Sequence, residues 1–337
     1  MRKKIVIFII GLFIGASFIP ICGSIGSKKE DVSNNVALNV FKNDSGKTIY
    51  VDDDWEDDPP NHKWDTIQEG ITDAVDCDTV FVYNGTYYEN LLIEKSIFLE
   101  GENKETTIID GSDLKRVVNI SCNNVTLKHF SIVHGRGGIN VWRSDNITIT
   151  ENIIKLNKGD GLYFYRSNGN TITHNVISEN GIFDPNVIAP CSGILIVHSS
   201  DTNISGNIVY GGSGWGMLIF SLNNSIISKN NITFNYFIGL DLYVSYDNFI
   251  IRNNFIENGK KRISGFLGDL TDNVHFLYVI FSYKKPYNNI WDGNFWGRGR
   301  ILPKPVFGEY RIFKDYIFSI PWVEFDWHPA REPYDIP

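Results

Sequence analysis

Large aromatic residues recur at a fixed spacing in this sequence, and an arginine follows two of them directly. Trp142 and Tyr165 are 23 residues apart, and Arg143 and Arg166 come immediately after them. Aromatic ring faces stack on sugar rings, and arginine forms paired hydrogen bonds with carboxylate groups. These residues therefore predict binding of a carbohydrate that carries acidic groups. The full set of candidate carbohydrate-binding residues is Trp142, Arg143, Tyr163, Tyr165, Arg166, Phe220 and Tyr243.

Residues suited to acid–base catalysis are sparse in the same region. Glycosidases need two carboxyl groups on either side of the bond that they cleave, but no two acidic residues are adjacent between positions 138 and 258. The candidate catalytic residues are Asp184, His198 and Arg166. The scarcity of carboxylates favours a binding protein over an enzyme, and both classes stay open.

A repeat of 23 residues accounts for the spacing of the aromatic residues. Each repeat contains a Gly, an apolar–any–apolar triplet directly after it, and an Asn 14 residues beyond the Gly. One interval is longer by nine residues, which predicts an insertion between Asn180 and Ser192, and a second insertion is expected near Lys260 to Thr271. A repeat of this length is typical of a solenoid. The glycines are Gly138, Gly161, Gly193, Gly216 and Gly239, and the asparagines are Asn152, Asn175, Asn207, Asn230 and Asn253.

The repeat predicts strands, because apolar and polar residues alternate in short runs. Three short strands and their corners fill one coil of a parallel β-helix, in which each coil buries its apolar side chains against its neighbours. We expect Gly and Asn to take left-handed corner positions and the asparagines to stack in a hydrogen-bonded ladder. The predicted fold is an all-β, right-handed, single-stranded parallel β-helix with coils of about 23 residues. One buried column should contain Ile149, Ile172, Ile204, Ile227 and Ile250.

Strand alternation decides which side chains face outward. After each repeated Gly, positions one and three point inward, and positions two and four point outward. Trp142, Tyr163 and Tyr165 then form an outward aromatic platform, with Asp184 reaching over it from the first insertion. The alternative is that the insertions, near residues 182–191 and 260–275, fold over this sheet and bury it.

The segments outside the repeat have compositions of their own. Residues 1–26 combine a basic start, an apolar run from Ile5 to Ile21 and small residues, which together predict a cleaved signal peptide. An uncleaved membrane anchor and a lipid-modified Cys22 are the alternatives. We expect a flexible segment over residues 27–47, the β-helix over 48–297 and a C-terminal capping segment over 298–337.

Both ends of a β-helix need caps, because an end coil has no neighbour on one side. At the N-terminal end, an apolar stripe predicts a capping helix over about residues 66–75. At the C-terminal end we expect an irregular, aromatic cap in which Trp322, Phe325 and Trp327 plug the core.

Charge and sequence motifs limit the range of partners. The net charge is −8, and it becomes −11 without the three basic residues of the predicted signal peptide. An acidic chain offers no electrostatic footprint for nucleic acid, so we expect no nucleic-acid partner, and contact with a membrane only through an uncleaved signal. Eight Asn-X-Ser/Thr sequons predict a glycoprotein. We also predict a monomer without a cofactor, and the alternative is Ca²⁺ bound by carboxylate oxygens. The acidic residues concerned are Asp52, Asp53, Asp54, Asp57 and Asp58.

Two parts of the sequence resemble known β-helix proteins. The run IYVDDDW, followed by WDTIQEGITDAVDCDTVFVYNGTYYENLLIEKSIFLEGENKETTIIDG, is similar to the opening segment of pectin-lyase-like proteins. The repeats after it resemble the NosD-like group of carbohydrate-binding and sugar-hydrolase β-helix proteins, and the resemblance covers roughly residues 48–297. It implies the parallel β-helix fold. For activity it implies a mixed group of polysaccharide lyases, hydrolases, epimerases and proteins without a known reaction.

Two details of the resemblance bear on chemistry. The NosD name implies periplasmic copper delivery, but the seven His residues are scattered and Met217 stands at a core position. Copper sites with soft ligands need clustered Cys, Met or His, so we predict no metal site. Phe183-Asp184-Pro185 resembles the FDPH element of alginate epimerases, and Asn186 replaces the His of that element.

The sequence therefore predicts an exported β-helix protein, at the cell surface or secreted, that binds polysaccharide or a cell-envelope glycan without catalysis. The alternative is a polysaccharide lyase, C5-epimerase or glycoside hydrolase that acts on uronate-containing glycans. The absence of a pair of acidic residues favours the first function.

Overall fold

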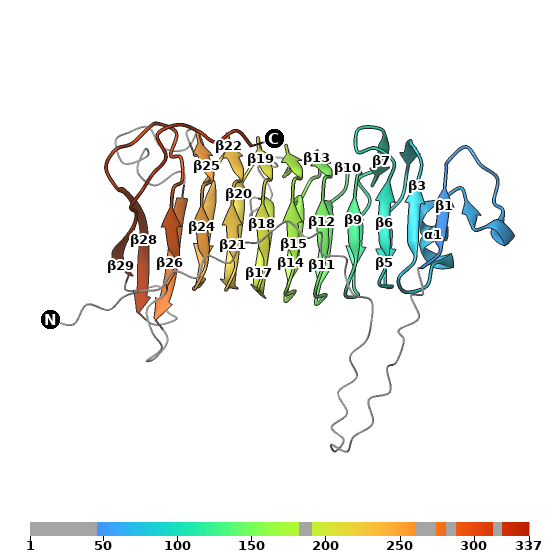
Figure 1. Ribbon diagram of the computed structural model, residues 1–337, viewed down its shortest axis with the longest axis horizontal. Helices are drawn as coiled ribbons and strands as arrows, with labels where there is room; N and C mark the ends of the chain where they lie inside the picture. Colours follow the sequence, from blue (N-terminus) through green and yellow to red (C-terminus); the bar gives the residue numbers. More distant parts are fainter. Residues whose placement is uncertain (1–45, 182–190, 260–273, 281–287, 313–318, 337) are drawn as a thin grey trace, which may run out of the picture. The chain divides into compact units, whose positions relative to one another are not determined.

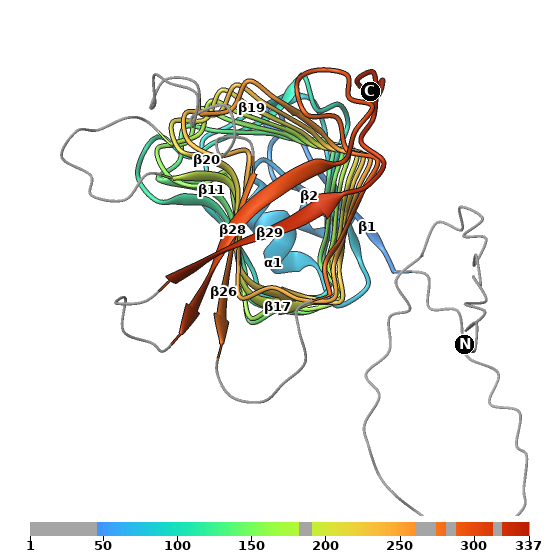
Figure 2. The ribbon, with the colours of Figure 1, turned by 90° about the vertical axis from the view of Figure 1, so that its left-hand side faces the viewer.

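The structure is a computed structural model that describes residues 46–181, 191–259, 274–280, 288–312 and 319–336. It is a parallel β-helix: the coils lie side by side along one axis (Figure 1), and their outlines superimpose when viewed along that axis (Figure 2). The predicted all-β fold with coils of about 23 residues is confirmed. Within the described residues, no helix is long and apolar enough to cross a membrane. The predicted signal peptide and Asp184 lie outside the described residues.

Each regular coil contributes one strand to each of three sheets, called A, B and C here. Sheet A has 11 strands, sheet B eight and sheet C ten. Sheet A contains β1 (Thr48–Val51), β2 (Lys63–Trp64), β3 (Thr79–Val82), β6 (Phe98–Gly101), β9 (Thr126–Lys128), β12 (Thr148–Thr150), β15 (Thr171–Thr173), β18 (Asn203–Ser205), β21 (Ile226–Ser228), β24 (Phe249–Ile251) and β27 (Ile290–Asp292). Sheet B contains β4 (Gly85–Tyr87), β7 (Thr107–Asp110), β10 (Ser131–Val133), β13 (Ile153–Lys155), β16 (Val176–Ser178), β19 (Ile208–Tyr210), β22 (Asn231–Thr233) and β25 (Asn254–Ile256). Sheet C contains β5 (Leu91–Ile93), β8 (Arg116–Ile120), β11 (Gly137–Trp142), β14 (Leu162–Tyr165), β17 (Ser192–Ser200), β20 (Trp215–Asn223), β23 (Leu240–Tyr243), β26 (Val274–Ile280), β28 (Lys304–Ile312) and β29 (Ser319–Asp326).

The register between coils brings equivalent residues of successive repeats into contact. In sheet A, Ile149 pairs with Ile172 and Ile172 pairs with Ile204. The column continues through the next two coils in the same way. All five side chains are fully buried, so the predicted isoleucine column is confirmed. Each coil thus completes its core only with the coils on either side.

The repeated asparagines form the predicted ladder. Nδ2 of Asn207 donates to Oδ1 of Asn230 at 3.0 Å, and Oδ1 of Asn207 accepts from Nδ2 of Asn175 at 3.0 Å. Nδ2 of Asn207 also donates to the backbone oxygen of Ile172 at 2.7 Å. The ladder therefore satisfies buried backbone groups at the corner between sheets A and B, where the strand ladders are interrupted.

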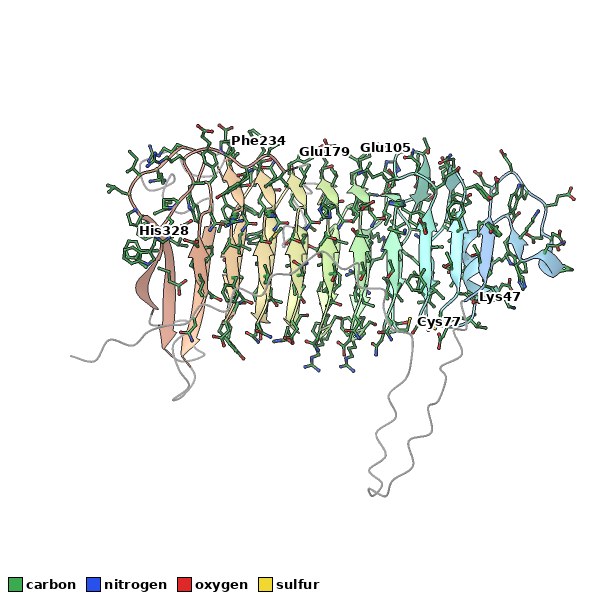
Figure 3. The ribbon with its side chains drawn as sticks, viewed as in Figure 1. Lys47, Cys77, Glu105, Glu179, Phe234 and His328 are labelled. Atoms are coloured by element: carbon green, nitrogen blue, oxygen red, sulfur yellow. The ribbon has the colours of Figure 1, made fainter. Side chains whose placement is uncertain are left out.

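The prediction that the repeated Gly and Asn take left-handed corners is wrong. The residue before each ladder Asn has the positive φ instead, for example Glu151 (55°) and His174 (55°). The repeated glycines are required for space: a Cβ on Gly161 would lie 2.7 Å from the carbonyl oxygen of Gly193. Corner residues at equivalent positions project from one edge of the solenoid, as Glu179 and Phe234 show in Figure 3.

The N-terminal cap is helix α1 (Ile67–Asp73), which lies within the predicted range. The backbone amide of Glu69 donates to Oγ1 of Thr66, which gives the helix its N-cap. The buried residues Ile67 and Ile71 turn the apolar face of α1 toward the first coil. Figure 2 shows α1 inside the outline of the coils.

The C-terminal cap corrects the prediction of an irregular segment. Strands β28 and β29 pair antiparallel and extend sheet C, in which β29 is the edge strand. Phe325 and Trp327 are exposed, so they do not plug the core. Trp291 and Trp296 are buried and do so, with Trp296 stacked on Phe255.

The end of the asparagine ladder is closed by a carboxylate. Asn253 donates to Asn294, which in turn donates to Oδ2 of the buried Asp326 at 3.1 Å. The step of 41 residues between these two asparagines leaves the ladder unbroken. The second predicted insertion, which falls in this step, lies outside the described residues.

Candidate functional site

The candidate binding residues come together on the outer face of sheet C. In β14, Leu162 and Phe164 are fully buried, whereas Tyr163 and Tyr165 between and after them are half-buried. Trp142 at the end of β11 is 44% exposed. Strand alternation therefore turns these three aromatic side chains outward.

One outward column of sheet C, the aromatic column, contains two stacked pairs of rings. The rings of Trp142 and Tyr165 lie 4.3 Å apart at 21°, and those of Phe220 and Tyr243 lie 4.7 Å apart at 20°. Val197 stands between the pairs, because it pairs with Tyr165 on one side and with Phe220 on the other. The column is thus an aromatic stack with one aliphatic interruption.

The aromatic rings stack on one another and do not form the open platform that the sequence predicted. Neighbouring strands lie about 4.8 Å apart, and the ring separations are close to that value, so the rings stack along the solenoid axis. One ring face of Trp142 and one ring face of Tyr165 are covered by their contact with each other. Their edges and outermost faces are the parts that a ligand can reach.

Two arginines and a histidine line the corner that follows this column. Arg143, Arg166 and His198 have left-handed backbones, with φ of 52°, 51° and 55°, and exposed side chains. Cζ of Arg166 lies 5.3 Å from the ring centre of Tyr165, and Cζ of Arg143 lies 6.0 Å from that of Trp142. In the described part of the chain, neither arginine forms an ion pair. Adjacent coils therefore present two uncompensated positive charges beside the stacked rings.

A second group on the same face was not predicted. Nη1 of Arg116 donates to Oδ1 of Asn140 at 3.0 Å, and Nδ2 of Asn140 donates to Oδ1 of Asn119 at 3.3 Å. Cζ of Arg116 lies 5.1 Å from the ring centre of Tyr163. We call these four residues the Arg116 group. The repeat did not reveal it, because Val117 stands in this coil where later coils have Gly.

A half-buried carboxylate, that of Asp160, lies within the electrostatic influence of Arg116. Oδ1 of Asp160 accepts from the backbone amide of Ser192 at 2.7 Å. Burial raises the pKa of Asp160, although the Ser192 amide and the charge of Arg116 act in the opposite direction. Burial also raises the pKa of Tyr163. The Tyr163 hydroxyl therefore stays protonated at neutral pH and can donate a hydrogen bond.

The outer face is more covered beyond β17. Leu218 and Asp241, both at outward positions, are buried. Nε1 of Trp215 donates to Oδ2 of Asp241 at 3.1 Å, and the Trp215 ring packs on that of Phe237. The face is thus open around β11 and β14, and partly covered around β20 and β23. Asp184, the insertion residue expected above it, lies outside the described residues.

Carboxylates gather near the N-terminal cap, as the prediction of a Ca²⁺ site requires. The two groups are Asp52, Asp53 and Asp54, and Asp57, Asp65 and Glu69. The amide of Thr86 donates to Asp53 at 3.1 Å, and the amide of Asp65 donates to Asp57 at 3.0 Å. Asp58 instead accepts from Nδ2 of Asn61. Carboxylate oxygens suit Ca²⁺, and binding of this ion stays a prediction.

Comparisons with known proteins relate the chain to other β-helices. The family model described as periplasmic copper-binding protein (NosD) matches residues 71–298. A cell surface glycoprotein of Methanothermus fervidus is 36% identical over 91 residues, which are 26% of this chain and 15% of that protein. The chain therefore spans only a small part of the length of this relative.

Solved structures show the same fold at low sequence identity. The alginate lyase of Paenibacillus sp. strain FPU-7 has a TM-score of 0.60 and 14% identity, over 74% of this chain and 86% of the lyase. Pectate lyase Pel9A has a TM-score of 0.50 and 14% identity, over 74% of each chain. At this identity the likeness extends to the fold alone.

The described residues do not fit a copper centre. His62, His134 and His328 pair with three different carboxylates on separate coils. Throughout the described ranges, the groups with three or more candidate ligands contain only Asp and Glu. Copper prefers nitrogen and sulfur ligands over such oxygen sets.

Proposed function

The chain belongs to the NosD family of β-helix proteins, and from this premise we propose that it works outside the cytoplasm and binds acidic polysaccharide. Three facts support the location: the family description is periplasmic, the relative is a cell surface glycoprotein, and the first 26 residues have the composition of a signal peptide. A role in copper transfer is not proposed, because the clustered candidate ligands of the described residues are carboxylates, which do not suit copper.

The observation that carries the proposal is the row of Arg143 and Arg166 beside the stacked rings of Trp142 and Tyr165. Both guanidinium groups are exposed and unpaired among the described residues, on a chain with a net charge of −8. A polysaccharide bound over these coils meets the side chains at equivalent positions of successive coils. Its carboxylates can pair with the arginines while its rings contact the aromatic residues.

The carboxylates of this face support binding better than hydrolysis. A glycosidase needs two carboxyl groups that flank the scissile bond. Asp160 is held by the Ser192 amide, and Asp241 is buried and bonded to Trp215. Neither is placed to act on a sugar bound at the arginine row.

Calorimetric titration with polygalacturonate and with a neutral glucan tests the proposal. We expect binding of the acidic polymer alone. A charge-assisted hydrogen bond contributes at least roughly 1.5 kcal/mol, so Arg143→Ala and Arg166→Ala should each raise Kd about tenfold. Lys229→Ala is the matched control, since Lys229 is an exposed cation at a left-handed corner on another edge. Equal effects of all three substitutions would contradict the proposal.

A second candidate function, polysaccharide lyase or C5-epimerase, is favoured by the Arg116 group. Arg116 and Asn140 can neutralise a uronate carboxylate, which makes the neighbouring C5 proton more acidic. His198, a candidate catalytic residue, would take that proton as the C4–O bond breaks, and Tyr163 would donate a proton to the leaving oxygen. Lyase activity would produce a conjugated double bond, which ultraviolet absorbance detects. Tyr163→Phe should abolish that signal and preserve binding. If the wild-type protein produces no such product and leaves C5 unchanged by NMR, the binding function alone stands.

A further inference from the structure

We infer that Val197 forms the floor of a slot that holds one uronate ring between the aromatic rings of Tyr165 and Phe220. The inference rests on the proposed function and deepens it, since it assigns one sugar of the bound chain to one coil. It concerns the single interruption of the aromatic column, which the proposed function does not use.

The stacking directions leave two ring faces turned toward Val197. One face of Tyr165 is covered by Trp142 of the preceding coil, so its opposite face points to the coil of Val197. One face of Phe220 is covered by Tyr243 of the following coil, so its opposite face points back to the same coil. Tyr165 and Phe220 therefore each turn the face that is not stacked on the other ring of its pair toward the half-buried Val197.

The separation of these faces fits one sugar ring. Successive strands are about 4.8 Å apart, so Tyr165 and Phe220, two strands apart, have ring planes roughly 10 Å from each other. Carbon atoms in contact lie about 3.5–4.0 Å apart, and two such contacts occupy most of that distance. The remainder accommodates the thickness of one puckered pyranose ring and excludes a second.

Valine at this position keeps the space open. Its methyl groups end close to the backbone, whereas the neighbouring rings extend further from the sheet. Leu195, two positions earlier on the same strand, is also half-buried and continues the apolar floor. An apolar floor with two apolar walls suits the C–H faces of a pyranose and gives its hydroxyl groups no partner within the slot.

Polar groups stand at the rim of the slot. His198 follows Val197 at the left-handed corner, is exposed, and lies edge-on to Tyr165 at 6.3 Å between ring centres. Arg166 occupies the same corner of the preceding coil. A carboxylate on the enclosed sugar can pair with Arg166 while a hydroxyl group bonds to His198. The occupant is therefore an acidic rather than a neutral pyranose.

Val197→Phe is the decisive substitution, because it fills the slot and leaves every wall and rim residue in place. We expect Kd for tetramannuronate, whose equatorial glycosidic bonds leave both faces of each ring free, to rise at least tenfold, while circular dichroism and the thermal midpoint stay unchanged or improve through a continuous ring stack. Val197→Thr, which has the same shape, should bind like the wild-type protein. Phe220→Leu, which removes one wall without filling the slot, should also weaken binding.

Saturation-transfer NMR provides a second readout. A ring enclosed between two aromatic faces receives saturation on the protons of both its faces, whereas a ring on an open platform receives it on one. If Val197→Phe binds like the wild-type protein while Arg166→Ala weakens binding, the slot is refuted and the proposed function survives. If the wild-type protein binds polygalacturonate but not tetramannuronate, the slot is also refuted; if it binds neither, the proposed function fails and the slot fails with it.

Discussion

Replacement of one ladder asparagine should destabilise the whole solenoid. Asn207 is fully buried, and Leu has a similar volume without the amide. The Asn207 side chain donates to the backbone oxygens of Ile172 and Ser205 and to Oδ1 of Asn230. Its Oδ1 accepts from the backbone amide and Nδ2 of Asn175. Asn207→Leu removes all five bonds.

The cost follows from the groups that lose their partners. Oδ1 of Asn230 keeps the bond from the Asn207 amide, and Nδ2 of Asn175 keeps the Ile149 oxygen. The Asn175 amide, the Ile172 oxygen and, in part, the Ser205 oxygen are left without the bonds that the side chain made. A buried group without a partner costs about 1–3 kcal/mol, so we expect a loss of about 4 kcal/mol in the free energy of unfolding.

Urea unfolding, followed by circular dichroism, measures this loss by linear extrapolation. Asn203→Leu is the matched control, because Asn203 is exposed on β18, in the same coil, and makes no side-chain hydrogen bond within the described residues. Both variants should be produced in a host without N-glycosylation. A difference between the two below about 1 kcal/mol would refute the assignment of the ladder as a main source of stability.

The remaining predictions concern a glycine, a buried lysine and the sequons. Gly161→Ala should lower the thermal midpoint by several degrees, because its Cβ would lie 2.7 Å from the Gly193 oxygen, and an unchanged midpoint would speak against this steric role. Burial lowers the pKa of Lys304 to about 8, below the unfolded value of about 10.4. Stability should therefore rise with pH between these two values and fall as the pH drops toward 8. Lys304→Met should lack this rise in urea midpoints, and an equal rise in both proteins would contradict the burial effect. In a host that glycosylates sequons, Asn203 should be modified, whereas Asn231, whose Oδ1 is buried, should not; peptide mapping by mass spectrometry that finds the reverse would overturn this order.

Much of the fold could be read from the sequence, because a solenoid converts sequence spacing into spatial contact. A residue and its equivalent 23 positions later become neighbours on adjacent strands, as Ile149 and Ile172 do. The same relation predicted the asparagine ladder and the outward side chains of Tyr163 and Tyr165. Only local alternation and a constant period are needed for such predictions.

Contacts that do not follow the 23-residue repeat were visible only in the tertiary structure. Arg116 meets Tyr163 across two coil steps from a coil without the repeated Gly, so no spacing signal marked it. Asp241 follows the outward pattern, yet it is buried against Trp215, whose side chain reaches it from the preceding coil.

Backbone conformation and ring orientation were also beyond the sequence pattern. Asn and Gly favour left-handed corners as single residues. In this solenoid the repeated Asn residues form the hydrogen-bonded ladder, and the repeated Gly residues stand where a Cβ has no space. Glu151 and His174 have the left-handed corner conformation instead. The sequence places Val197 between aromatic positions without showing how those rings lie. Their direction depends on contacts between coils: Tyr165 stacks on Trp142 and Phe220 stacks on Tyr243, so each pair is closed on the side away from the valine.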